Sequence, residues 1–220
     1  MDDRWTALAT LSDPSRRSLY DYVRRQDHPV GREEAAAATA MSRGLAAFHL
    51  DKLVDAGLLT ARYEPPADQP RGRGRAPKVY APAGDGLAIT VPERRYELIA
   101  DILAEAVVGG REPAGEAAAR LAYRRGRNLT AHLRGDGADM LGVLAGLGFE
   151  PRSEAGAVAL HNCPFHALAA RHTALVCGLN HAFVSGLVDG LGVAGVDTLL
   201  APRAGHCCVE LRVGSSDGER

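Results

Sequence analysis

The sequence predicts an α+β protein of two domains, and three observations lead to this class. Apolar residues recur at helical spacing over residues 4–56 and are followed by two short strand-like runs. A segment rich in proline and glycine, residues 81–91, then interrupts the pattern. After this segment, helical runs and short apolar runs alternate, which suits a small antiparallel sheet. The chain of 220 residues is long enough for two such domains.

The composition is that of an ordinary globular protein, with 46% apolar residues, 24% charged residues and a net charge of -1. This balance excludes a disordered or fibrous chain. Residues 1–82 carry 13 Lys and Arg against 11 Asp and Glu, whereas residues 83–220 carry 13 against 16. We therefore expect any contact with a polyanion to be made by the first of these two parts.

The start of the chain is acidic and lacks the apolar run of a signal peptide. Charges and glycines interrupt every apolar run before it reaches the length of a membrane span, so we expect no membrane and a cytoplasmic location. In that compartment the four cysteines are expected to be thiols or metal ligands rather than disulfides.

The first helices are marked by caps and breakers. Asp13 followed by Pro14 is typical of a helix start, so one helix before this pair and a second after it are expected within residues 4–23. Residues 28–31 break the helical pattern, and a short alanine-rich helix is predicted over residues 32–39. Ser42 begins a further helix that Gly57 ends.

The helix over residues 42–56 has an apolar stripe formed by Ala46, Leu50, Leu53 and Val54. A short helix, a tight turn and a helix of this length form a helix-turn-helix, whose second helix fits the major groove of DNA. Strands are predicted over residues 57–63 and 78–81, with a basic loop between them. The two strands and this loop form a wing, and its arginines are expected to reach phosphates or the minor groove.

Three segments resemble the ArsR-like winged helix-turn-helix regulators of bacteria, namely LSDPSRRSLYDYV, MSRGLAAFHLDKLVDAGLL and RGRGRAPKVY. The resemblance implies a DNA-binding domain over residues 1–82 that binds a double-stranded operator. The residues expected at the DNA are Ser42, Arg43, Ala47, His49, Lys52, Arg71, Arg73 and Arg75. Where many relatives carry polar base-reading side chains, this chain has Gly44, Ala46 and Ala47. The alternative is a winged helix that contacts protein.

Residues 83–110 are predicted to be a linker and a helix that pairs in a homodimer, because such folds usually read two half-sites. The alternative is that this helix packs only within its own chain. Residues 111–220 form the predicted α+β sensor domain. Its expected elements are helices over residues 115–127 and 136–147, a hairpin over residues 149–161, and strands over residues 197–201 and 207–213.

The organising segment of the sensor domain is residues 162–193, which follows the helical pattern. Pro164 suits a first helical turn, so Cys163 is expected at a helix N-terminus, where the pKa of a thiol falls. His166 lies in the same turn, and Cys177 lies further along. Thirteen residues separate Cys163 from Cys177, which is not the tight spacing of a zinc finger.

The remaining cysteines, Cys207 and Cys208, are predicted to alternate across a strand, so that only one of them faces a given site. Glycines at positions 178, 186, 190 and 192 are expected to allow the sheet to pack closely on the helix, or to form a pocket. His161, His172 and His181 are expected to be ordinary surface residues.

The segments NCP at residues 162–164 and GHC at residues 205–207, together with Cys177, resemble the SufR-like repressors of iron-sulfur-cluster assembly genes. The resemblance implies that Cys163, Cys177 and Cys207 hold an iron-sulfur cluster that controls DNA binding. The first spacing is one residue longer than in those proteins, and Cys208 is an added thiol. The fourth ligand position is left open among His166, His206, Cys208, Glu210 and solvent.

Two other functions stay open at this stage. Thiolates and imidazoles also bind zinc, so the site can be a zinc centre. In a third reading an organic effector binds the sensor domain and the cysteines only pack as small apolar side chains. The sequence shows no grouping of nucleophile, base and orienting residue and no carboxylate pair, so an enzyme is not expected.

Overall fold

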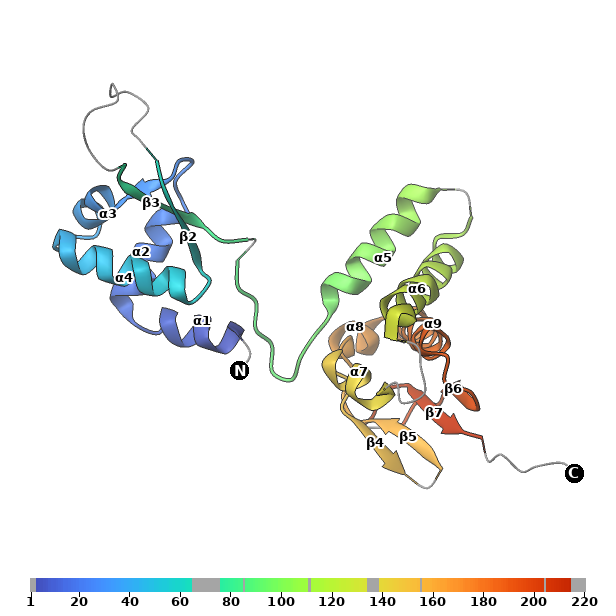
Figure 1. Ribbon diagram of the computed structural model, residues 1–220. Coiled ribbons are helices and arrows are strands. Elements are labelled where there is room, and N and C mark those ends of the chain that lie inside the picture. Colours follow the sequence, from blue (N-terminus) through green and yellow to red (C-terminus); the bar gives the residue numbers. More distant parts are fainter. Residues whose placement is uncertain are drawn as a thin grey trace, which may run out of the picture. The chain divides into compact units, whose positions relative to one another are not determined.

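The computed structural model describes residues 3–214, apart from 65–75, 85, 111, 134–138, 155 and 204 (Figure 1). It is an α+β structure in which helices accompany two small antiparallel sheets. The chain divides into two compact units, Met1–Ile89 and Thr90–Arg220. The division falls within the proline- and glycine-rich segment, and each unit has its own hydrophobic core.

The N-terminal unit contains four helices and three strands among its described residues. They are α1 (Asp3–Leu11), α2 (Pro14–Val23), β1 (Val30–Gly31), α3 (Arg32–Ala38), α4 (Arg43–Asp55), β2 (Leu59–Tyr63) and β3 (Lys78–Pro82). The strands form an antiparallel sheet in the order β1-β3-β2. The sequence pattern missed β1, because only two residues pair there, and a repeat of two residues cannot show over so short a run.

The predicted caps and apolar stripe of this unit are confirmed. The side chain of Asp13 accepts a hydrogen bond from the Arg16 amide at 2.9 Å, and that of Ser42 accepts one from the Leu45 amide at 3.3 Å. These bonds satisfy amides that a helix start leaves unpaired. The stripe of α4 faces the core, and its members Ala46, Leu50 and Leu53 are fully buried.

A charged contact attaches α4 to the sheet. The Asp51 carboxylate accepts hydrogen bonds from Lys78 Nζ at 2.6 Å and from the Tyr80 hydroxyl at 2.8 Å. Burial raises the pKa of Asp51, but the hydrogen bonds from Lys78 and Tyr80 together outweigh burial, so the pKa is lowered. The carboxylate is therefore ionised at neutral pH, and it joins the predicted second helix of the helix pair to β3.

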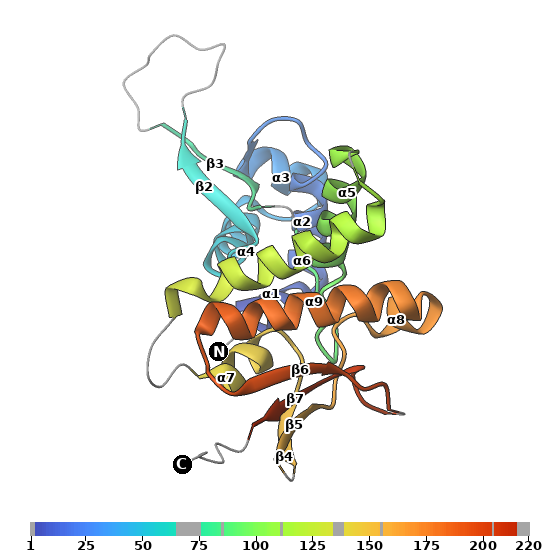
Figure 2. The same cartoon turned by 90° about the vertical axis from the view of Figure 1, so that its right-hand side faces the viewer.

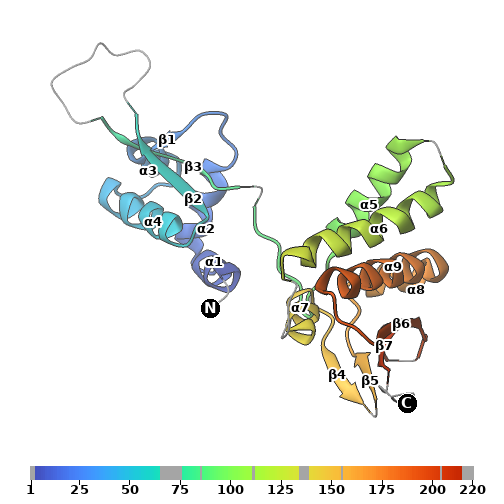
Figure 3. The same cartoon turned by 45° about the vertical axis from the view of Figure 1, so that its right-hand side comes forward.

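The C-terminal unit consists of helices stacked on one face of a four-stranded sheet. Its helices are α5 (Tyr96–Gly109), α6 (Ala114–Thr130), a 3-10 turn (Ala131–Leu133), α7 (Met140–Gly146), α8 (His166–Arg171) and α9 (Thr173–Leu191). Its strands are β4 (Pro151–Glu154), β5 (Ala157–Leu160), β6 (Val196–Leu200) and β7 (Val209–Val213), in the antiparallel order β4-β5-β7-β6. Figures 2 and 3 show α9 between the sheet and α6.

Two boundaries in this unit differ from the sequence prediction. The helical segment predicted from Cys163 onward is divided at His172 into α8 and α9, and α8 begins only at His166. The last strand begins at Val209 rather than at Cys207. Both differences affect cysteines, because they leave Cys163 and Cys207 in loops beside the regular elements.

Glycines allow α6 and α9 to meet backbone to backbone. A Cβ atom at Gly186 of α9 would lie 2.0 Å from the Tyr123 carbonyl oxygen of α6, and one at Gly126 of α6 would lie 2.1 Å from the Phe183 carbonyl oxygen of α9. The Thr130 hydroxyl adds a hydrogen bond of 2.9 Å to the Leu187 carbonyl. The prediction that the sheet is the close partner of these glycines is wrong, because the partner of Gly186 is another helix.

Helix α9 is also long and apolar enough to pass as a membrane span by length and composition. Of the apolar window within it, 61% is buried inside the unit. This burial fits a core helix, since α9 packs on α6 on one side and on the sheet on the other.

Replacing Gly186 by alanine should destabilise the protein by about 3 kcal/mol, because the methyl group would push against a backbone carbonyl that cannot turn away. Gly178→Ala in the same helix is the matched control, since nothing lies within 4 Å of its added Cβ. The control should gain up to about 1 kcal/mol from helix propensity. Urea unfolding of both variants measures the difference, and equal stability would contradict the backbone contact.

Candidate functional site

All four cysteines converge in the C-terminal unit, and we call them the thiol cluster. Cys163 follows β5, Cys177 lies in the second turn of α9, and Cys207 and Cys208 immediately precede β7. Each of them is at most 7% exposed, and none is in a disulfide. Cys163 interacts with Cys207, Cys207 with Cys208, and Cys208 with Cys177. Thiols from three separate segments thus form one group.

Backbone hydrogen bonds hold Cys207 and Cys208 in place ahead of β7. The Cys207 amide donates to the Leu160 carbonyl at 2.8 Å, and the Cys208 carbonyl accepts from the Ala201 amide at 2.7 Å. Because the strand begins only after them, their side chains do not alternate across it. The prediction that only one of these two thiols can face the site is therefore wrong, since each interacts with another cysteine of the cluster.

The pKa values of Cys163, Cys177 and Cys207 are raised. For Cys163 the neighbouring Cys207 thiol is the largest cause and burial the second. Hydrogen bonding to Cys163 lowers the pKa of Cys207, but Cys208 and burial raise it to about 11. Burial is the main cause of the raised pKa of Cys177. The prediction that a helix N-terminus lowers the pKa of Cys163 is wrong, because α8 begins three residues later.

Asn180 of α9 is a polar partner of the thiol cluster that the sequence pattern did not reveal. Its side chain is 1% exposed, and its Nδ2 donates to Cys207 Sγ at 3.0 Å and lies 4.0 Å from Cys208 Sγ. Its Oδ1 is buried and has no hydrogen-bond partner among the described residues. The spacing of three residues from Cys177 placed Asn180 on the same helix face, and that was the available signal.

The loop that carries Cys163 is attached to the residues that precede α5. Arg94 Nη1 donates to the Asn162 side-chain oxygen at 2.8 Å and to the Cys163 carbonyl at 2.7 Å. The Arg95 amide donates to the Pro164 carbonyl at 3.1 Å. We call this set the Arg94 clamp. It joins the thiol cluster to the place where the chain enters the C-terminal unit, and the residue pattern did not reveal it.

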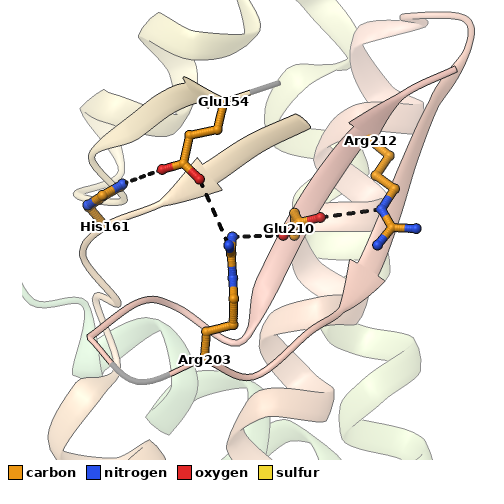
Figure 4. Close-up of polar contacts among 5 residues, drawn as sticks. All are labelled: Glu154, His161, Arg203, Glu210 and Arg212. Atoms are coloured by element: carbon orange, nitrogen blue, oxygen red, sulfur yellow. Dashed lines mark hydrogen bonds and ion pairs between the residues drawn. The ribbon is translucent and has the colours of Figure 1, made fainter. Parts of the chain in front are cut away.

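Among the side chains considered for a fourth ligand, Cys208 is the one in contact with other thiols of the cluster. His166 is exposed at the start of α8, whereas the thiols are buried. The ring of His206 stacks edge to face on that of His161, with centroids 4.5 Å apart. Glu210 accepts hydrogen bonds from two arginines, as Figure 4 shows.

In the N-terminal unit, the outer face of α4 carries exposed charges that are paired with acidic groups. Arg43 forms an ion pair with Glu33, and Lys52 forms one with Asp55 at 3.2 Å. Ser42 is exposed beside them, and its hydroxyl caps the helix. Both cations remain about half exposed, so a phosphate can compete for them.

The other residues predicted to contact DNA fall into different places. His49 is 8% exposed and packs edge to face against Phe48, so it offers little surface to a base, and its contact with DNA stays a prediction. Ala47 is half-buried. The wing arginines Arg71, Arg73 and Arg75 lie outside the described residues. The sequence pattern did not single out Leu45 and Phe48, which are 45% and 55% exposed.

Comparison of the chain with protein-family models and with curated proteins found no match. The resemblance to the ArsR-like and SufR-like regulators therefore stays a prediction based on the quoted motifs. The site is defined by its own geometry, which is a buried group of four thiols with one amide donor and an attached arginine clamp.

The metal-free protein should shield all four thiols from a soluble disulfide reagent, because none is more than 7% exposed and attack requires local opening. We expect reaction with 5,5'-dithiobis(2-nitrobenzoate) to be at least about tenfold slower in the native protein than in urea. The unfolded chain should release four equivalents, which is the internal control. Fast reaction of two or more thiols in the native protein would contradict their burial.

Proposed function

We propose that this protein is a cytoplasmic, dimeric, DNA-binding transcription regulator whose thiol cluster holds an iron-sulfur cluster. The observation that carries the proposal is the convergence of four buried cysteines from three separate segments. Cysteines that merely fill a core have no reason to meet one another, whereas ligands of one cofactor must do so. The proposed function includes no enzymatic activity.

The donor set fits an iron-sulfur cluster. Cys163, Cys177 and Cys207 would be the ligands, and Cys208 is the side chain best placed for the fourth position. The Asn180 amide already donates to Cys207 Sγ, and hydrogen bonds of this kind to sulfur tune such centres. A bound cluster would supply a group that responds to iron, sulfide and oxidants. The raised pKa values mean that ligation must displace protons from the thiols.

Zinc is the second candidate for the same residues. Four thiolates are a complete ligand set for tetrahedral Zn²⁺, and the chain of interactions from Cys163 through Cys207 and Cys208 to Cys177 could supply them. A closed zinc site would be structural, because it leaves no open position for reaction. The two candidates differ in sulfide content, so measuring inorganic sulfide in the purified protein distinguishes them.

The N-terminal unit supports the DNA-binding part of the proposal. The element order, with α3 and α4 followed by the β2-β3 ribbon, supports the proposal of a winged helix-turn-helix. We propose that α4 enters the major groove and that Arg43 and Lys52 bind phosphates. Since Gly44, Ala46 and Ala47 offer no polar side chains, shape and backbone contacts should contribute much of the binding.

Helix α5 supports the proposed homodimer. Val107 and Val108 at its C-terminal end are 68% and 87% exposed, whereas Ile99, Ile102 and Ala106 of the same helix are buried. A second copy of α5 would remove this apolar surface from water. A dimer of this kind would present two recognition helices to two half-sites of an operator.

The Arg94 clamp supports coupling between the two functions. The thiol of Cys163 would ligate the cofactor, and the carbonyl of the same residue accepts a hydrogen bond from Arg94. Arg94 lies five residues after the division between the units. A change in the Cys163 loop would therefore act on the segment that leads to the DNA-binding unit. Cofactor binding at the thiol cluster and DNA binding would then be linked by a coupling free energy.

The cofactor can be tested by measuring iron, sulfide and zinc in protein purified without oxygen. We expect iron and sulfide in the wild type, and at least about a tenfold loss in Cys163→Ser and Cys208→Ser, because each change removes a thiolate ligand. His166→Gln, an exposed change in the neighbouring helix, is the control and should keep the full content. Zinc without sulfide would favour the second candidate, and equal metal in Cys163→Ser would refute the ligand assignment.

The DNA-binding part can be tested by selecting duplexes from a random library with cofactor-loaded and cofactor-free protein. On a selected duplex, Lys52→Ala should weaken binding and lower the slope of log K against log salt by about 1, because one phosphate contact is lost. Arg24→Ala, just after α2, removes a comparable exposed, ion-paired cation and should leave the slope unchanged. Failure of both protein forms to bind any duplex would overturn the proposal.

A further inference from the structure

A second group of metal-ligating side chains lies outside the thiol cluster. Glu154 ends β4, His161 follows β5, and His206 belongs to the loop before β7. The ligand atoms of these three residues all lie within 4.8 Å of one another. His161 Nε2 lies 3.0 Å from Glu154 Oε1, and Figure 4 shows the two side chains pointing toward each other.

We propose that Glu154, His161 and His206 form a binding site for a divalent transition-metal ion, separate from the thiol cluster. Two imidazoles and one carboxylate suit Zn²⁺, Fe²⁺, Co²⁺ or Ni²⁺, whereas Mg²⁺ and Ca²⁺ prefer oxygen ligands throughout. Three protein ligands leave a coordination position open for water or a small anion. The site therefore has the composition of an open metal centre rather than of a closed structural one.

The spacing of the ligand atoms suits such an ion with little movement. Metal-ligand bonds of 2.0–2.2 Å in a tetrahedral site place the donor atoms about 3.3 Å apart. The pair His161 and Glu154 already has this separation, at 3.0 Å. The rings of His161 and His206 are also in contact, and the ligand atoms of all three residues lie within 4.8 Å of one another.

The surroundings orient the carboxylate and leave the site accessible. Arg203 Nη1 lies 3.9 Å from Glu154 Oε2, and Arg203 Nη2 donates to Glu210 Oε2 at 2.8 Å (Figure 4). Arg203 thus lies between two carboxylates, and Glu210 offsets its charge near the metal site. The side chains of Glu154 and His161 are 41% and 25% exposed, so an ion can enter from solvent.

The new site shares two chain segments with the thiol cluster. Cys163 follows His161 by two residues, and Cys207 follows His206 directly. The two sites nevertheless differ in donor chemistry and burial, because the thiols are buried and bear sulfur, whereas these ligands are accessible and bear nitrogen and oxygen. A probe that distinguishes sulfur from nitrogen and oxygen ligands can therefore report on each site separately.

Cobalt(II) is such a probe. Titration of the cofactor-free full-length protein under nitrogen should give visible d–d bands from the nitrogen and oxygen site, apart from the near-ultraviolet thiolate-to-cobalt charge transfer of the thiol cluster. His161→Gln and His206→Gln should each lower the cobalt affinity of the nitrogen and oxygen site at least about tenfold. His172→Gln, an exposed histidine outside the group, is the matched control and should bind as the wild type does.

Two further variants separate the possible outcomes. Glu154→Gln keeps shape and exposure but removes the charge, so it should weaken the same bands while circular dichroism and the melting temperature show an intact fold. Cys163→Ser should weaken the thiolate-to-cobalt charge-transfer band and keep the d–d bands of the nitrogen and oxygen site. The new site can therefore be tested independently of the proposed function. Undiminished bands in His161→Gln and His206→Gln, or a wild type that shows sulfur-ligated cobalt alone, would overturn the site and leave a simple histidine-glutamate hydrogen bond.

Discussion

The backbone contact between α6 and α9 is the constraint on which the C-terminal unit depends. Gly126 and Gly186 bring carbonyl groups of one helix to the place where a side chain of the other would stand. This contact fixes α9, which carries Cys177 and Asn180 and covers the sheet. The sheet in turn positions the loops of the other cysteines. A shift of about an ångström between α6 and α9 would therefore displace the cysteines of the thiol cluster.

The thiol cluster combines burial with mutual contact, and each has a chemical effect. The neighbouring Cys207 thiol and burial raise the pKa of Cys163, and burial raises that of Cys177, so these groups are neutral in the metal-free protein at physiological pH. Neutral thiols can share an apolar site without the cost of buried charge. A soft metal centre would replace these protons and take up the same sulfur atoms. Under the proposed function, one site would therefore have a protonated state and a metal-bound state, as a sensor requires.

Much of the fold could be predicted from local patterns, because caps and apolar periodicity depend on residues close in sequence. Asp13, Ser42 and the stripe of α4 are examples. The two-residue strand β1 and the division between α8 and α9 were missed, since they depend on tertiary pairing. The burial of His49, the joint contacts of Cys207 and Cys208, and the Arg94 clamp likewise depend on segments far apart in the chain. Residue spacing along the chain does not show which distant segments come into contact.

The Arg94 clamp has a consequence for how the two ends of the protein would influence each other. One guanidinium nitrogen is shared by the side-chain oxygen of Asn162 and the carbonyl of Cys163. The segment around Arg94, before α5, is thus positioned by the loop that carries Cys163. Linkage is reciprocal, so under the proposed function an operator would change the affinity for the cofactor by the same factor by which the cofactor changes affinity for the operator. Promoter occupancy would then help to decide which molecules in the cell retain their cofactor.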